Sequence, residues 1–124
     1  MAGPLSGIRV ADFTWVWAGP TCTMQLAHMG AEVIRMETSA RICALRMLPP
    51  WFGGAPNPNR SGYFNQYNQG KRAILLNIAD AEGAAIAKRL VAMSDIAVEN
   101  FAAGVMKKLG LDYDELVKVR PELI

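Results

Sequence analysis

Residues 7–30 constrain the fold of this chain more than any other stretch. Val10 and Phe13 belong to a short run in which apolar side chains alternate, which is typical of a β-strand. A tight turn follows, and Pro20 suits the start of a helix because the first helical N–H groups have no partner within the helix. Gly30 then provides a helix stop. A strand, a turn and a helix form half of a βαβ unit, whose ligands lie beyond the carboxyl ends of the strands. The turn at residues 15–20 is therefore the first candidate for a site.

The rest of the sequence repeats this alternation. We expect further strands at residues 31–37, 71–78 and 94–100, and helices at residues 21–29, 81–93, 105–109 and between Asp112 and Pro121. Asp80 is a good N-cap residue, and Asp112 with Glu115 resembles a capping box. Crossover connections through helices make the strands parallel. The helix at residues 21–29 is apolar nearly all round, and we expect it to be covered on both sides. Residues 122–124 look like the start of a fifth strand, so we expect a longer domain.

Residues 38–70 lack regular periodicity and predict a long loop with one helical turn near residues 41–47. Long loops in compact domains are usually lids, binding loops or disordered segments. The density of aromatic residues argues against disorder, because such side chains are normally buried. Two interpretations remain. We favour a loop packed on its own domain or on a partner subunit, and the alternative is a lid that faces a substrate.

Composition excludes several classes of function. The 124 residues are 52% hydrophobic and 19% charged, which indicates one globular domain. A net charge of +2, with basic and acidic residues interspersed, does not indicate a nucleic-acid partner, although it suits a small anionic ligand. Cys22 and Cys43 are expected to be free thiols in a reducing compartment, hence a cytoplasmic protein. We expect no metal site, because His28 is the single histidine and its helix position indicates packing in the interior. No apolar run is long enough to predict a membrane span.

Four predicted strand ends should converge on one edge of the sheet, where a nucleotide would bind. The chain contains neither the Gly-x-Gly-x-x-Gly fingerprint nor a P-loop, so the pattern alone leaves the ligand open. Trp15 and Trp17 alternate, and we expect one to face the core and the other the site edge. Lys71 and Arg72 are interpreted either as a solvated start of a strand or as charges near a phosphate.

Six successive blocks of the sequence resemble the signatures of the family III CoA-transferases, in order and with matching spacing. The blocks are VADFT with AGP at residues 10–20, GAEVIRME at 30–37, NQGKR at 68–72, VENF at 98–101, GVMKKLG at 104–110 and RPELI at 120–124. The family includes formyl-CoA, carnitine and benzylsuccinate CoA-transferases and α-methylacyl-CoA racemase. The resemblance covers the chain from Leu5 onward. It implies an α/β, Rossmann-like, mostly parallel sheet with flanking helices, in which residues 1–124 are the N-terminal CoA-binding segment of a larger interlaced dimer.

The resemblance implies that a CoA thioester binds along this sheet edge. It implies one group of residues at the pantetheine and thioester end, a second around the adenine, and a third at the ribose and pyrophosphate. These groups are, in order, Val16, Trp17 and Ala18; Leu76, Asn77, Ile78 and Ala79; and Asn100, Phe101 and Ala102.

At three positions this chain has a different residue from the one that is usual in the family. Lys108 matches a position that is usually Arg and contacts phosphate. Thr38 is a further cofactor-binding position, where the family often has a basic residue that Arg41 could replace. The formyl-CoA branch has Gln at the position of Trp17, so Trp17 indicates a different acid substrate or a shaped apolar pocket.

The resemblance also implies a chemistry. Family transferases use an Asp carboxylate that attacks the acyl-CoA and passes through mixed anhydrides and an aspartyl thioester. That Asp follows the block at residues 120–124, so we expect no catalytic residue in this chain, and no activity from these residues alone. The implied partners are an acyl-CoA and an organic acid, with a homodimer or a related second subunit. One alternative is an α-methylacyl-CoA racemase, which uses a downstream His and Asp pair. Another is a truncated, non-catalytic CoA-binding or assembly module.

Overall fold

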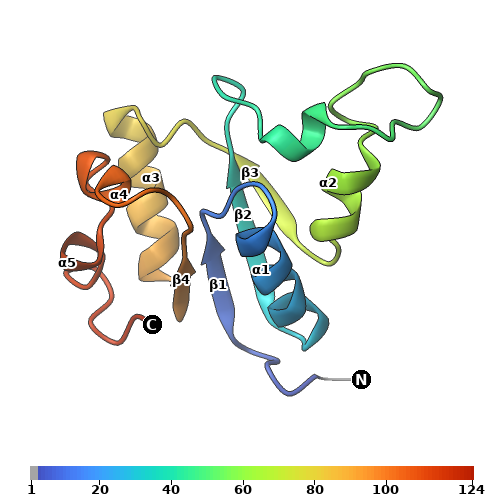
Figure 1. Cartoon of the computed structure of the whole chain (residues 1–124). Coiled ribbons are helices and arrows are strands. Elements are labelled where there is room, and N and C mark those ends of the chain that lie inside the picture. Colours follow the sequence, from blue (N-terminus) through green and yellow to red (C-terminus); the bar gives the residue numbers. More distant parts are fainter. Residues whose placement is uncertain (1–2) are drawn as a thin grey trace.

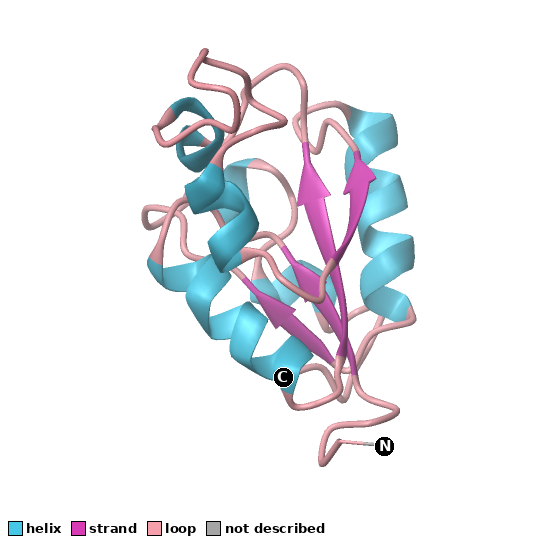
Figure 2. Cartoon of the chain, turned by 90° about the vertical axis from the view of Figure 1, so that its right-hand side faces the viewer, coloured by secondary structure: helices cyan, strands magenta, loops and turns pink. Residues whose placement is uncertain are grey.

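The computed structural model describes residues 3–124, which form a four-stranded sheet with helices on both sides (Figures 1 and 2). The strands are β1 (Arg9–Asp12), β2 (Glu32–Glu37), β3 (Arg72–Leu75) and β4 (Ile96–Val98). The helices are α1 (Ala18–His28), α2 (Gly62–Tyr67), α3 (Ala81–Ala92), α4 (Val105–Lys108) and α5 (Tyr113–Leu116), with a 3₁₀ helix at Ala44–Met47. The strand order is β3-β2-β1-β4 and every pair is parallel. The predicted α/β, Rossmann-like fold is confirmed.

The register of the sheet brings the carboxyl ends of the strands to one edge. Asp12 at the end of β1 lies opposite Arg35 of β2 and Val98 of β4. Glu37 at the end of β2 lies opposite Leu75 at the end of β3. In Figure 1 the four arrowheads point the same way, so the turns that follow the strands share one side of the molecule.

Each face of the sheet has its own apolar core. On one face, Phe13 packs with Val91 of α3, Leu111 and side chains of α4 and α5, all nearly inaccessible to solvent. On the other face, Val10 and Val33 pack against the apolar side of α1. Burying an apolar side chain of this size contributes about 1.5–3 kcal/mol. Two packed faces therefore hold the strands firmly beneath the turns.

The first helix departs from prediction at its start and at His28. It begins at Ala18 rather than at residue 21, so Pro20 lies within its first turn. Its outer side is not covered within the part of the chain described, where Cys22, His28 and Met29 are exposed. The predicted interior position of His28 is therefore wrong. An apolar composition all round a helix does not reveal which side meets the sheet.

The predicted loop at residues 38–70 contains more regular structure than its sequence indicates. The 3₁₀ helix falls within the expected helical turn, but α2 was not predicted. At six residues, α2 is too short to show an apolar period. Its one signal is Ser61, a residue type favoured as an N-cap. Buried Cys43, Leu45 and Ser61 show that this segment packs on its own chain.

Ser61 joins the two halves of this segment and supports a prediction. Its hydroxyl donates to the Leu45 carbonyl at 2.6 Å and accepts from the Phe64 amide at 3.3 Å. Ser61→Ala leaves the buried Leu45 carbonyl without this donor and removes the cap, so it should lower the free energy of unfolding by about 1–2 kcal/mol. Denaturant titration measures the change. Ser39→Ala, an exposed position in the same segment, serves as the control and should change stability by less than about 0.5 kcal/mol; equal losses in both variants would contradict the assigned role.

The predicted cap residues behave differently from expectation. Asp80 and Asp112 precede α3 and α5, but neither carboxylate caps its helix. The Asp80 carboxylate instead accepts from the Asn77 side-chain amide at 2.8 Å. At the other end of the chain, Ile124 donates to the Asp95 carbonyl and accepts from the Ala97 amide, the pattern of a parallel ladder beside β4. The expected fifth strand is not assigned, yet its first hydrogen bonds are present.

Candidate functional site

An open cavity of about 580 Å³ lies at the carboxyl edge of the sheet, within the usual size range of small-molecule sites. Its walls come from the turns after all four strands and from one side of α4. The lining residues are Trp15, Val16, Thr38, Ala40, Arg41, Asn77, Ile78, Ala79, Asn100, Phe101, Ala102, Val105 and Leu109. Most of the residues predicted for cofactor binding are therefore brought together in one place.

Four of the predicted residues do not line this cavity. Trp17 packs against α2, Ala18 is exposed at the start of α1, Leu76 lies deeper beside Phe13, and Lys108 is exposed on α4. The lining residues that sequence reasoning left out include Ala40, Val105 and Leu109. Val105 begins α4 and Leu109 directly follows it, and their apolar side chains give no sign in the sequence of whether they meet a core or a cavity.

A buried polar network supports the first turn from below. The Asp12 carboxylate, fully inaccessible to solvent, accepts from the Thr14 amide at 2.9 Å and from the Thr14 hydroxyl at 2.5 Å. Its second oxygen accepts from the Thr23 hydroxyl at 2.7 Å. Because Thr23 belongs to α1, one carboxylate joins the end of β1, the turn and the helix. The conformation of the turn is thus fixed by side-chain bonds.

Lys71 completes this network, so the interpretation as a solvated start of a strand is wrong for Lys71 and fits only Arg72. Its ammonium, on a side chain only 2% exposed, lies 3.2 Å from the Asp12 carboxylate and donates to the Pro20 carbonyl at 2.9 Å and to Asn68 at 3.0 Å. Burial lowers the pKa of Lys71 from its ordinary value, while the Asp12 charge opposes that shift. Arg72 points outward and pairs with Glu32. Neither residue lines the cavity.

The turn is also tied to the end of β4. The side-chain amide of Asn100 accepts from the Trp15 amide and donates to the Trp15 carbonyl, both at 2.8 Å. Val16 then adopts a positive φ of 64°, a rare conformation for a β-branched residue that often marks functional sites. A Cβ at Gly19 would lie 2.8 Å from Asn100 and 2.5 Å from Thr14, so only glycine fits there.

Trp17 lies in an aromatic cluster outside the cavity. Its ring centroid is 5.7 Å from that of Tyr63 and 5.5 Å from that of Tyr67, both on α2. Trp17 remains 51% exposed. Trp15, in contrast, lines the cavity and meets the Phe101 ring edge-on at 5.9 Å. We expected one tryptophan to face the core and the other the site edge. Trp15 does lie at the site edge, but Trp17 packs on α2 instead of in the core.

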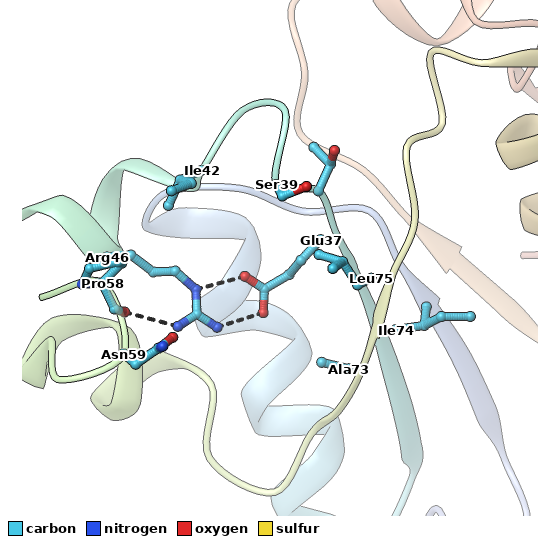
Figure 3. A pocket seen from close by; sticks show the side chains of 10 residues that line it. Glu37, Ser39, Ile42, Arg46, Pro58, Asn59, Ala73, Ile74 and Leu75 are labelled. Atoms are coloured by element: carbon cyan, nitrogen blue, oxygen red, sulfur yellow. Dashed lines mark hydrogen bonds and ion pairs between the residues drawn. The ribbon is translucent and has the colours of Figure 1, made fainter.

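A smaller pocket of about 320 Å³ adjoins the cavity at Thr38 (Figure 3). At its centre, the Arg46 guanidinium holds both oxygens of the Glu37 carboxylate at 2.8 Å and also donates to the Pro58 carbonyl at 3.0 Å. Arg46 stacks on the Phe64 ring of α2. Since both Glu37 oxygens are occupied by this bidentate pair, Glu37 organises the loop and is not a free base.

The described residues, 3–124, hold no cluster of three or more His, Cys, Asp and Glu side chains suited to a metal ion. No helix among them combines the length and apolar character needed to cross a bilayer. Cys22 and Cys43 are free, as expected. Among the described residues, the lining of this cavity contains no aspartate or glutamate.

Comparisons with known proteins agree with this fold and identify the family. The sequence pattern of CoA-transferase family III matches residues 5–124. The chain is 40% identical over 122 residues to a succinyl-CoA:mesaconate CoA-transferase of Haloarcula marismortui, covering 98% of this chain and 31% of that protein. It is 39% identical to a succinyl-CoA:glutarate CoA-transferase of Mus musculus, covering 98% of this chain and 27% of that protein. A crystal structure of a CAIB/BAIF family protein from Brucella suis superposes with a TM-score of 0.88 at 34% identity, covering 100% of this chain and 32% of that one. The chain thus spans about a third of the length of these relatives.

Proposed function

The chain belongs to CoA-transferase family III, and we propose that it is the CoA-binding segment of an enzyme that moves CoA from an acyl-CoA donor to a carboxylic acid. The observation that carries this proposal is the single cavity formed by the turns after all four parallel strands. Its position fits the general rule for ligand sites in open α/β sheets. Its lining, mostly apolar with a few polar groups at the rim, suits a long thioester with charged phosphates.

The proposed orientation of CoA follows the three groups of residues implied by the family resemblance. Asn77, Ile78 and Ala79 contact the adenine, Asn100, Phe101 and Ala102 the ribose and pyrophosphate, and Val16 the pantetheine. The common lining of one cavity by all of these residues supports this orientation. Residues 1–124 then constitute an N-terminal Rossmann-like CoA-binding segment.

The proposed chemistry requires a carboxylate nucleophile from elsewhere in the protein. Asp12 is buried and held by four hydrogen-bonding or ionic partners, which suits a structural role. Asp95 pairs with Arg120 and accepts from the Arg9 amide at the amino end of β4, whereas the cavity lies at the carboxyl ends of the strands. We therefore propose that the acyl group is attacked by an Asp outside these 124 residues, and that this chain supplies binding and orientation.

The proposed protein acts in the cytoplasm as a dimer, or with a related subunit. Two free thiols are consistent with a reducing compartment. The uncovered outer side of α1, together with Met29 just after the helix at 40% exposure, is consistent with a covering partner.

Calorimetric titration of the chain with CoA tests the proposal. Saturable binding is expected with a dissociation constant between about 1 µM and 1 mM, the range of ordinary substrates. Ala102→Trp, which places a large ring in the cavity, should weaken CoA binding about tenfold or more, whereas Ala85→Trp on the exposed side of α3 should not change it. Failure of CoA to bind, or equal effects of the two tryptophans, would exclude this cavity as the CoA site.

A further inference from the structure

Arg41 is a cation at the rim of the cavity with no acidic partner among the ion pairs formed by residues 3–124. Instead, its guanidinium carbon lies 5.4 Å from the centroid of the Trp15 ring, within the range of a cation–π interaction. A guanidinium that rests on a ring face keeps its in-plane N–H groups free to bind an anion.

Trp15 is itself held by Asn100 and Phe101, which follow β4 and form another wall of the cavity. Both backbone groups of Trp15 are bonded by the Asn100 side chain at 2.8 Å, and its ring meets Phe101 edge-on. The ring is therefore a fixed platform, while Arg41 is exposed on a segment whose nearby support is the Ala40 amide bonded to the Thr38 hydroxyl. Of the two side chains, Trp15 is the fixed one, so the position of the Arg41 guanidinium depends on the Trp15 ring.

Building on the proposed function, we propose that Trp15 is a positioning residue: its ring holds the Arg41 guanidinium at the cavity rim, where Arg41 binds a phosphate of CoA. Arg41 lines the cavity, whereas Lys108, which the family resemblance implies for phosphate, does not. Trp15 acts on the phosphate through Arg41, and its effect on affinity must disappear when Arg41 is absent.

Titration with CoA and with pantetheine, which lacks every phosphate, separates the possibilities. Arg41→Gln should weaken CoA binding about tenfold and leave pantetheine binding unchanged. Trp15→Leu should weaken CoA binding about two- to fivefold, and Trp15→Phe, which retains a ring face, should restore most of that loss. Trp15→Leu combined with Arg41→Gln should be no weaker than Arg41→Gln alone. Arg89→Gln on exposed α3 is the matched control.

The outcomes distinguish this inference from the proposed function. If the unaltered chain binds neither CoA nor pantetheine, the proposed function fails. If CoA binds but Arg41→Gln weakens both ligands equally, or Lys108→Gln causes the phosphate-dependent loss instead, the assignment to Arg41 is overturned. If Trp15→Leu matches the unaltered chain, or weakens binding equally with and without Arg41, the positioning role is overturned. Trp15→Met, large and apolar but without a ring, replaces Trp15→Leu if that variant does not fold.

Discussion

Replacing Lys71 with methionine should lower the free energy of unfolding by about 3–5 kcal/mol, because it leaves the Asp12 carboxylate buried without its counter-charge. Methionine keeps much of the length and apolar bulk of lysine, so the loss reports on the charge and its bonds rather than on a cavity. Thermal and denaturant unfolding measure the change. Losing the donor to the Pro20 carbonyl should also loosen the start of α1.

Two further variants make this expectation specific. Arg72→Met removes the neighbouring cation, whose side chain is 76% exposed, and should change stability by less than about 1 kcal/mol. Asp12→Asn combined with Lys71→Met removes both charges and should be more stable than Lys71→Met alone. A double variant as unstable as the single one would show that the charge of Asp12 is not the source of the loss.

Gly19→Val should cost about 3 kcal/mol of stability and weaken CoA binding at least tenfold. A Cβ at this position would lie 2.5 Å from the Thr14 Cβ and 2.8 Å from the Asn100 side chain, so the turn or the end of β4 must move. Either movement breaks the paired bonds between Asn100 and Trp15 at the cavity wall. Denaturant titration and calorimetry with CoA give the two quantities.

The control for Gly19→Val is Ala85→Val, which introduces the same β-branched side chain at an exposed position of α3. This control should lose less than about 1 kcal/mol through helix propensity and keep its CoA affinity. If Gly19→Val were destabilised but bound CoA normally, the close packing at Gly19 would matter for folding only.

The order of the four strands and of α1, α3, α4 and α5 could be predicted because each has a signal in its own stretch of sequence. The alternation of apolar residues around Val10 and the helix stop at Gly30 can be recognised from a few neighbouring residues, and the same is true of β2 and β3. The helix α2 and the buried side of α1 could not be predicted, because a short helix shows no period and an apolar helix does not indicate which side meets the sheet.

The candidate site shows the same division. The convergence of Val16, Asn77 and Asn100 follows from parallel strands and could be predicted from their order alone. The burial of Lys71 could not, because its partners, Asp12 and the Pro20 carbonyl, are more than fifty residues earlier in the chain. The separation of Trp17 from the cavity depends on the tyrosines of α2, which were expected in an irregular loop.

The reciprocal bonds between Asn100 and Trp15 have a consequence for the kinetics of association. They make the first turn and the end of β4 move as one body, so two walls of the cavity need no ordering when a ligand arrives. The segment at residues 38–42 is tied down by fewer bonds and forms the facing rim. Ligand entry and release should therefore follow the opening of that rim, and amide hydrogen exchange should be slow at Trp15 and fast at Ser39 and Arg41.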